Sequence, residues 1–387
     1  MESRERVEDA IEELGNKVRP WIAAPLLVLE ANRGRLATDP RDKIFAFLGL
    51  IHNSKALIIP DYSQTVTETY TSFASAMLRH ESLKPSLEIL SYAGLGARSA
   101  PDLQDLPSWV PDWRAPTRDL QRQFNHKLYK AARVSLPKGL PKMSPDSRSL
   151  RVWGILYDVV SDSVEHGWDT EVAASIRLPF NDRFQTYPTG CSILEAYLKT
   201  MSADAKNDVT NKRLSDDSDY FITLTAGFLR TALSLWCETQ DPPIDHDTNC
   251  YLLEQLVQRQ YLPPALFQDL GLGELLTSLN QHQRSLLAEQ LKDTMELEHI
   301  WRDMKAEYDY QRCLIATEKG YMGITPPYTR VGDCICVLFG SYVPMIMRPV
   351  EDHFILIGEA YVHGIMDGEV MAELESGKVT PREFDIH

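Results

Sequence analysis

The sequence predicts an α+β protein that is mainly helical and ends in a small, barrel-like C-terminal sheet. Apolar residues recur with helical spacing in the first part of the chain, most regularly over 66–80. Beyond Arg312 the pattern changes to short apolar runs separated by glycines, which is typical of short, strongly bent strands. The 387 residues exceed what one core usually organises, so two or three domains are expected.

The N-terminal region, residues 1–136, is expected to be helical. Residues 2–18 are charged with a helical pattern, and Ile22–Leu29 is an apolar run just after a proline, as in a buried helix. A capping sequence precedes the apolar segment 44–50, which predicts a helix start there. The helix over 66–80 places its apolar side chains on one face: Val66, Tyr70, Phe73 and Met77.

The middle region, residues 137–310, is predicted to contain one strand followed by helices. The strand is the apolar, β-branched run 150–160. Residues 201–219 are polar and rich in aspartate, so we expect a mobile loop. Four helical segments fit between Tyr220 and Met304, separated by prolines and a glycine.

The C-terminal region, residues 311–387, is predicted to be a small β unit. Its strands are short and are joined by glycine turns, as in a bent sheet or barrel. The expected strands are Cys313–Thr317, Cys334–Phe339, Pro344–Met347 and Phe354–Tyr361.

Composition excludes several classes of protein. The chain is 43% apolar and 25% charged, unlike a disordered chain, collagen or a disulfide-rich mini-protein. No apolar run approaches the ~20 residues that span a bilayer, and the N-terminus does not resemble a signal peptide. A cytoplasmic protein without a membrane span is therefore expected. The net charge of −15 argues against nucleic acid and anionic membranes as partners.

No motif in the sequence carries a reaction signature. The hydrolase elbow, the P-loop and the zinc-binding H-E-x-x-H motif are absent, and Gly94-x-Gly96 lacks the third glycine of a dinucleotide loop. The acidic run 216–220 fits a solvated loop better than a metal-binding box. Cys334 and Cys336 share one face of a strand and are interpreted as reduced core residues rather than metal ligands. No cofactor and no metal are expected.

Three polar residues near the C-terminus are candidates for acid–base chemistry. Glu359, Tyr361 and His363 alternate onto one face of a strand, where they form either a catalytic array or a hydrogen-bonded structural cluster. Arg348 ends the neighbouring strand and is expected to be within reach of Glu359. One such ion pair is weak evidence of function.

Two tryptophans are candidates for binding a ligand. Trp109 and Trp113 lie in the proline-, glycine- and tryptophan-rich loop 95–116. They either wall an apolar pocket or hold the long loop against the core. This loop and the polar loop 201–219 are the candidate lids.

Several blocks together resemble the region that follows the HET domain in fungal heterokaryon-incompatibility proteins. Their order is kept from residue 37 to residue 369. The blocks are Ala37–Leu50, Ile59–Ser63, Leu106–Trp113, Gly320–Pro326, Gly332-Asp333, Val343-Pro344 and Ile357–Glu369. The HET domain's own Ser-Tyr-x-Trp-Gly and Asp-x-x-Cys-Ile-Asn-Gln blocks are not found. The resemblance therefore implies a free-standing relative without the effector part, which is thought to resemble nucleotide-cleaving TIR domains.

The resemblance leaves three functional hypotheses. The first is a cofactor-independent cyclase, a Diels–Alderase-like pericyclase acting on an apolar terpenoid or polyketide of a fungal natural-product pathway. It requires a shaped apolar pocket and one or two hydrogen-bond donors. Trp109 and Trp113 would be the walls, and His363, Tyr361 and Arg348 the catalytic donors. We place it first because the effector blocks are missing while the remainder looks foldable.

The second hypothesis is a truncated incompatibility protein that acts as a regulatory or interaction module in self/non-self recognition. It requires an exposed contact surface, or self-association into a homo-oligomer, rather than a closed pocket. The third is a structural remnant with neither a pocket nor a patch. Whether the chain is an enzyme, and which small-molecule substrate it would take, stays open at this point.

Overall fold

The computed structural model describes ten parts of the chain, on which all structural statements below rest. They are residues 23–50, 57–79, 87–97, 105–115, 128–132, 141–164, 186–206, 212–239, 272–292 and 312–387. The expected helix at 2–18 lies outside these residues. No helix within them is long and apolar enough to cross a membrane.

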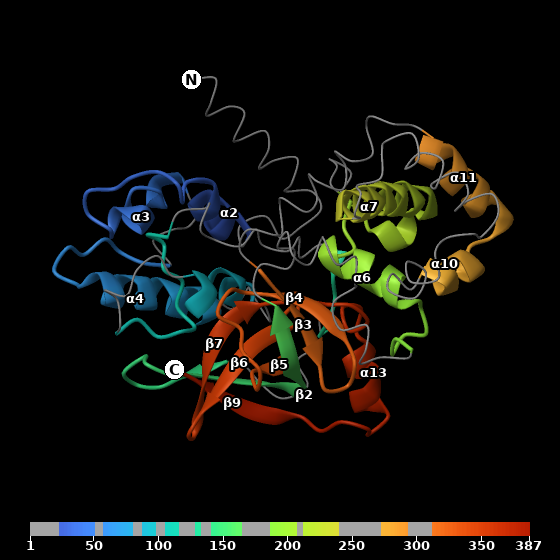
Figure 1. Ribbon diagram of the computed structural model, residues 1–387. Coiled ribbons are helices and arrows are strands. Elements are labelled where there is room, and N and C mark those ends of the chain that lie inside the picture. Colours follow the sequence, from blue (N-terminus) through green and yellow to red (C-terminus); the bar gives the residue numbers. More distant parts are fainter. Residues whose placement is uncertain are drawn as a thin grey trace.

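A mixed sheet of nine strands forms the base of the molecule (Figure 1). Its strands are β1 (Lys142–Met143), β2 (Leu150–Val164), β3 (Cys313–Thr317), β4 (Met322–Thr325), β5 (Cys334–Leu338), β6 (Met345–Val350), β7 (His353–Glu359), β8 (Tyr361–Val362) and β9 (Arg382–Ile386). The pairings β2–β9, β9–β7, β7–β6, β6–β5 and β5–β2 return to their starting point, so these five strands form a closed ring. β3, β4 and β8 continue the sheet from the far end of β2.

The long strand β2 connects the ring with the rest of the sheet. Its first part pairs with β9, its middle with β5 and its end with β3. Gly154 is paired on both sides, with Leu338 and with Arg382. A Cβ at this position would lie 2.7 Å from the carbonyl oxygen of Val337. Glycine therefore permits the close strand approach at the point where β2 changes partners.

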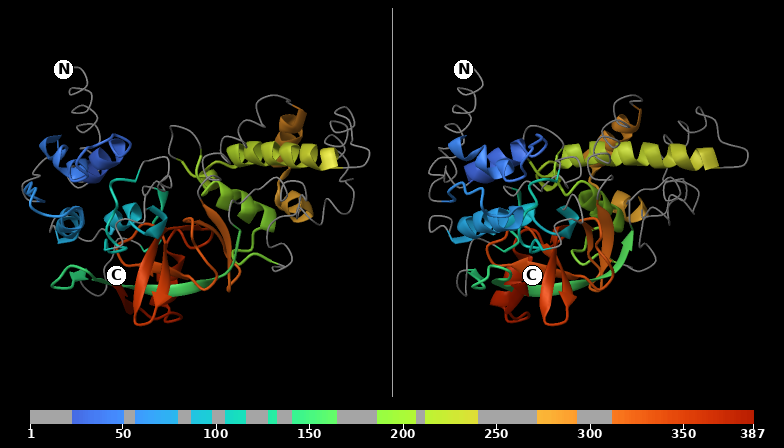
Figure 2. Two further views of the ribbon diagram at one scale, coloured as in Figure 1. Left: turned by 60° about the vertical axis from the view of Figure 1, so that its left-hand side comes forward. Right: turned by 90° about the vertical axis from the view of Figure 1, so that its left-hand side faces the viewer.

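The helices form two separate groups above the sheet, one at the left and one at the right of Figure 1 (Figures 1 and 2). The first group contains α2 (Ala23–Ala31), α3 (Asp42–Phe45) and α4 (Val66–Arg79), and the second α6 (Ile193–Met201), α7 (Ser218–Thr239), α10 (Leu272–Ser278) and α11 (Gln281–Lys292). The short α13 (Glu369–Glu375) lies beside the sheet. Among the described residues there are also four short 3₁₀ helices: η1 (Leu48–Leu50), η4 (Glu88–Tyr92), η5 (Leu95–Ala97) and η7 (Leu214–Asp216).

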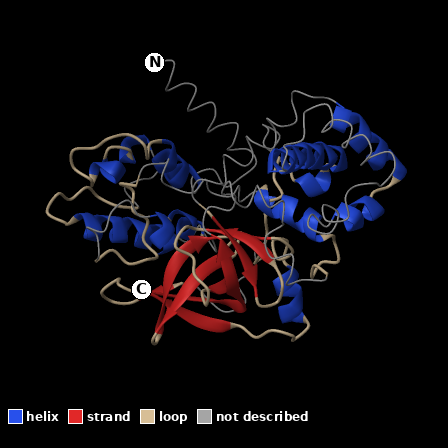
Figure 3. Cartoon of the chain, in the orientation of Figure 1, coloured by secondary structure: helices blue, strands red, loops and turns tan. Residues whose placement is uncertain are grey.

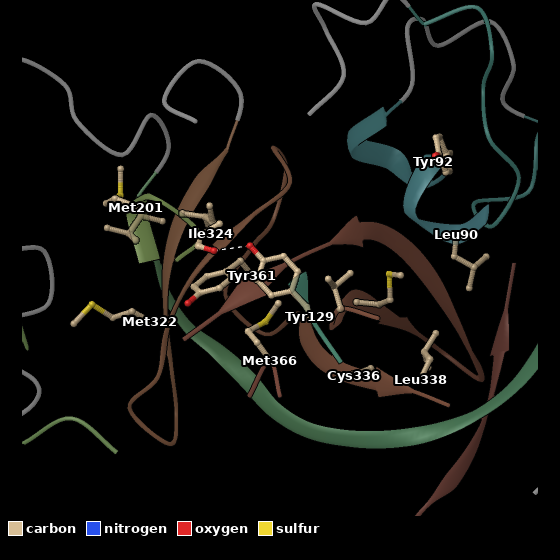
Figure 4. Packing of buried hydrophobic residues seen from close by; sticks show 14 of the residues in the cluster. Leu90, Tyr92, Tyr129, Met201, Met322, Ile324, Cys336, Leu338, Tyr361 and Met366 are labelled. Carbon is tan, nitrogen blue, oxygen red and sulfur yellow. Dashed lines mark hydrogen bonds between the residues drawn. The ribbon is translucent and has the colours of Figure 1, made fainter. Parts of the chain in front are cut away.

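Both faces of the ring strand β5 are buried. Cys334, Cys336 and Leu338 of β5 join one hydrophobic cluster, while Ile335 and Val337 join another. Figure 4 shows the first cluster, in which β5 packs near residues of η4 and near Tyr361. Burial on both faces explains why β5 is apolar throughout instead of alternating.

The α+β class is confirmed, and so are β strands within each of the four segments predicted after residue 312. The predicted predominance of helix is not confirmed, because the nine-stranded sheet is the largest assembly among the described residues (Figure 3). The sheet is also not purely C-terminal, since β1 and β2 belong to it. The predicted boundaries at 136/137 and 310/311 stay a prediction.

Candidate functional site

Tyr361 and His363, two of the predicted catalytic residues, lie together beside Cys191. The Tyr361 hydroxyl is 3.2 Å from His363 Nδ1, and the Cys191 sulfur is 3.8 Å from His363 Nε2. Cys191 and His363 are partly exposed, whereas Tyr361 is buried. The imidazole thus contacts a phenol on one side and a thiol on the other.

The backbone around these side chains brings the two segments into contact. The Tyr187 hydroxyl donates to the His363 carbonyl oxygen and accepts from the Met322 amide, both at 2.9 Å. Gly364 has φ +99°, and a Cβ there would lie 2.6 Å from the Thr189 methyl. A residue with a side chain at 364 would push the 187–191 turn away from His363.

Cys191 lies directly before Ser192, the N-cap residue of helix α6. Ser192 caps this helix, and its hydroxyl accepts a hydrogen bond from the Glu195 amide at 3.2 Å. Cys191 also accepts a hydrogen bond from the Thr189 hydroxyl at 3.2 Å. The cap and the threonine hold the thiol in one place at the start of the helix.

The electrostatic environment keeps this cluster uncharged. Burial lowers the pKa of His363 to about 3, and the cations Lys199 and Arg213 add to the shift. Burial also raises the pKa of the Cys191 thiol and that of the Tyr361 hydroxyl. The resting state at neutral pH is therefore a neutral imidazole between a thiol and a phenol.

A buried ion pair lies next to the cluster. Asp204 is fully buried. Its carboxylate accepts hydrogen bonds from Arg213 Nε at 2.8 Å and from the Ser215 hydroxyl at 2.7 Å. Arg213 also binds Asp367 and lies 5.6 Å from the Tyr129 ring centre. The Tyr129 ring in turn packs edge-on against Tyr361, 5.8 Å between centres (Figure 4).

The segment 201–219, predicted to be a mobile loop, contains this ion pair in its described part. Ala203 and Asp204 have φ values of +49° and +51°, a conformation that side-chain-bearing residues rarely adopt. Such backbone strain persists only where surrounding contacts hold it. Asp217 of the acidic run binds Lys206 at 2.7 Å and accepts a hydrogen bond from the Tyr220 amide, at the start of α7.

Arg348 is not part of the Tyr361–His363 cluster, and its expected pairing with Glu359 is wrong. It forms a two-point ion pair with Asp333, with Nε–Oδ1 at 2.8 Å and Nη2–Oδ2 at 2.9 Å. Glu359 instead faces Arg312 at 3.6 Å. Asp333 precedes β5, and β5 pairs with the β6 strand that carries Arg348, so the sheet register selects this partner.

The two predicted pocket walls are core residues. Trp109 is 0% and Trp113 is 1% exposed. The Trp113 ring lies 6.3 Å from Phe73 and 5.8 Å from Tyr92, and the Arg33 guanidinium lies over it at 4.9 Å. The loop that bears them is thereby held against α4 and η4.

Arg41 lies in the block Ala37–Leu50, one of the blocks that resemble incompatibility proteins, and its side chain joins two loops. Arg41 binds the Asp39 carboxylate at 2.6 Å and donates to the carbonyl oxygens of Tyr62 and Gln64, each also at 2.6 Å. The Tyr62 hydroxyl donates back to Asp42 at 2.6 Å. The blocks Ala37–Leu50 and Ile59–Ser63 therefore hold each other in place.

Sequence reasoning missed Cys191, Tyr187, Arg213 and Asp204 as members of the cluster around His363. The only local signal was a turn sequence, Thr189-Gly190-Cys191-Ser192, directly before a helical pattern. Within the described residues, no group of three His, Cys, Asp or Glu side chains is arranged to hold a metal ion. Cys334 and Cys336 are buried, and burial raises the pKa of both thiols.

The comparisons with known proteins agree with the resemblance seen in the sequence blocks. Residues 253–378 match the family model of the Het-6 beta-barrel domain. The chain is therefore similar to heterokaryon-incompatibility proteins and resembles their C-terminal region. It is 27% identical over 354 residues to "Heterokaryon incompatibility protein 6, OR allele" of Neurospora crassa, a match that covers 86% of this chain and 49% of the relative. The chain thus spans about half the length of that relative. No solved structure matches the chain significantly.

Proposed function

We propose that this protein acts as a regulatory or interaction module in fungal self/non-self recognition. The observation that carries the proposal is the similarity to an incompatibility protein over 86% of the chain. This was the second of the hypotheses raised by the sequence. The cyclase, raised first, has no support from these similarities.

Exposed apolar side chains on the clamped loops support a contact surface. Leu36 is 101%, Ile59 74% and Tyr62 56% exposed. All three lie on the two loops that Arg41 joins. Single exposed apolar residues are ordinary, but three on loops held in a fixed geometry favour a protein contact.

The packing of the tryptophans favours the interaction module over the cyclase. A cyclase pocket needs apolar walls that a substrate can touch. Trp109 and Trp113 are instead covered by protein atoms. Arg348, expected to donate to a substrate carbonyl, is occupied by Asp333 and by the Tyr328 carbonyl oxygen.

Deletion of the gene in its own fungus tests the proposal. We expect altered heterokaryon formation between paired strains and an unchanged profile of small-molecule extracts. The opposite result, unchanged strain fusion with accumulation of an uncyclised or isomeric metabolite, would overturn the proposal and restore the cyclase.

Reintroducing the gene with point substitutions into the deletion strain locates the contact surface. Leu36→Asp and Ile59→Asp place a charge on the clamped loops, and we expect both to reproduce the deletion phenotype. Val331→Asp is the matched control, because Val331 is 63% exposed on the separate turn between β4 and β5. A full rescue by Leu36→Asp and Ile59→Asp would exclude this surface.

A further inference from the structure

The ring of strands is least firmly closed between β7 and β9, a contact that we call the seam. Among the described residues, Phe354 and Ile386 are the one pair that faces across it. By contrast, β7 is paired with β6 from His353 to Glu359, and β9 is paired with β2 from Arg382 to Ile386. The ring centres of Phe354 and Phe384 lie 5.2 Å apart. The seam thus has side-chain packing but almost no backbone ladder.

Ser108 connects the two strands where this ladder is missing. Its hydroxyl accepts a hydrogen bond from the Leu356 amide of β7 at 2.9 Å. The same hydroxyl and the Ser108 amide, the latter at 3.0 Å, donate to the carbonyl oxygen of His387, the residue that follows β9. The His387 amide in turn donates to the Phe354 carbonyl oxygen at 2.9 Å. One serine thus makes the connection that a further pair of strand residues would otherwise make.

Ser108 lies in residues 105–115, far from both strands in the sequence. It is separated by 248 residues from the β7 amide that it binds. Its own segment is held in place by other contacts. Trp109, next to the serine, is 0% exposed, and Arg33, just after α2, donates to the Asp112 carbonyl oxygen at 2.9 Å. The N-terminal part of the chain therefore positions the serine that joins β7 to β9.

We propose that residues 105–115 are a strap that keeps the ring closed, and that the seam is where the ring opens first. Opening at the seam breaks few backbone hydrogen bonds, because β7 stays paired with β6 and β9 with β2. Native proteins open in such local units at free energies below that of complete unfolding. The strap also covers the β7 edge, and an uncovered strand edge is a template for pairing with other chains.

The two sides of β7 provide an internal comparison. Phe354 and Leu356 direct their backbone groups toward the seam, whereas Ile355 is paired with Arg348 of β6. Successive backbone amides of a strand point to opposite sides. An opening at the seam therefore exposes the Leu356 amide to solvent and leaves the Ile355 amide bonded to β6.

Native-state hydrogen exchange of the full-length protein, followed at single amides by nuclear magnetic resonance, tests the proposal. We expect the Ser108 and Leu356 amides to show equal protection and the same response to low concentrations of urea, because one opening exposes both. We expect both to be less protected than the Ile355 amide and than the amide of Cys336, whose strand is paired with β2 and with β6.

Ser108→Ala removes the hydroxyl and leaves the backbone of the strap. The Leu356 amide loses its acceptor and is expected to exchange about tenfold faster. The amides of position 108 and of His387 keep their own acceptors, so their exchange reports on the seam itself. We expect their exchange to rise by a similar factor, while that of the Ile355 amide stays unchanged.

Ser341→Ala is the matched control. Ser341 is buried to a similar extent as Ser108, and its hydroxyl donates to the Val343 carbonyl oxygen at 2.7 Å in the turn between β5 and β6. This substitution also removes a buried hydroxyl with a hydrogen bond, but away from the seam. We expect it to leave the seam amides unchanged. Near-ultraviolet circular dichroism shows whether each variant is folded.

Four outcomes would overturn the proposal. Unchanged exchange in folded Ser108→Ala would mean that the hydroxyl does not hold the seam. Faster exchange of the Leu356 amide alone would mean that the serine only satisfies one edge amide. An equal rise at the seam in Ser341→Ala would show a general loss of stability. If Ser108→Ala does not fold, the wild type still decides, because seam amides as well protected as the Cys336 amide would exclude the seam as the first place to open.

Discussion

Arg213 neutralises Asp204 inside the protein: its Nε lies 2.8 Å from a carboxylate oxygen whose side chain is completely buried. The same guanidinium reaches Asp367 in the turn before α13. One side chain therefore connects the segment between α6 and α7 to the β unit. Arg213 also lies over the ring of Tyr129, and Tyr129 packs against Tyr361 of the Tyr361–His363–Cys191 cluster.

Arg213→Leu is expected to lower the free energy of unfolding by about 3–5 kcal/mol. Removal of one partner leaves the Asp204 carboxylate buried without its counter-charge. Urea denaturation of purified protein measures the loss. In an Asp204→Asn background the same substitution should cost clearly less, because the charge is already gone; an equal cost in both backgrounds would show that Arg213 acts by packing alone.

Gly94→Ala is expected to destabilise the protein by about 3 kcal/mol or more. Gly94 has φ +106°, and a Cβ there would lie 2.4 Å from the Ile357 carbonyl oxygen in β7. The strain of an alanine at this positive φ and its clash with the carbonyl oxygen both lower the stability of the variant. Gly332→Ala is the control, with a similar φ of +92° but no atom within 4 Å, so it should cost only about 1 kcal/mol. Equal losses of stability for Gly94→Ala and Gly332→Ala in thermal melting would show that the close approach of Gly94 to β7 is not the cause.

Trp113→Ala is expected to cost about 3–5 kcal/mol, because it opens a cavity against Phe73 and Tyr92. The Arg33 guanidinium, buried over the indole, also loses its aromatic contact. Chemical denaturation checks the value, with Leu36→Ala as an exposed control that should change stability by less than about 0.5 kcal/mol. A loss below about 1 kcal/mol for Trp113→Ala would contradict its assignment to the core.

Acid is expected to destabilise the fold partly through His363. Its pKa is about 3 in the folded protein, below the ordinary value of 6.5, so the unfolded chain binds this proton first. Stability therefore falls as the pH drops below about 6.5, by at most about 1.4 kcal/mol per pH unit, and this is an upper limit because the side chain is partly exposed. Lys199 and Arg213 are the cations that face His363, and Cys191 and Tyr361 stay neutral because burial raises the pKa of both groups.

The measurement compares unfolding free energies of the wild type and His363→Gln between about pH 4 and 6. We expect the wild type to lose more stability than the variant on going to the lower pH. Parallel pH profiles for the two proteins would show that His363 does not titrate differently on folding.

Local sequence patterns predicted the elements that depend on neighbouring residues. The apolar positions of 66–80 predicted α4, which ends at Arg79. The short apolar runs after Arg312 predicted β3, β5, β6 and β7. The order of the family-like blocks indicated the family that the comparisons support. These signals are short-range, since helix and strand periodicity are properties of a few adjacent residues.

The clustering around His363 could be predicted only in part. The two-residue spacing predicted that Tyr361 and His363 lie close together, and they do, but β8 ends at Val362 and His363 lies in the turn that follows. Cys191 and Arg213 come from segments far away in the sequence, and no local pattern relates them to His363. The pairing of Arg348 was predicted wrongly because its partner depends on which strand lies beside β6.

The sequence by itself determined the α+β class, most of the regular elements that could be checked and the family resemblance, because each depends on local periodicity or on motifs read in order. Only the tertiary structure decided that β2 closes a ring with the C-terminal strands, that the two tryptophans are covered, and that Cys191 meets His363. These features depend on contacts between distant segments, and such contacts are selected by the packing of the whole core, not by any one stretch of the chain.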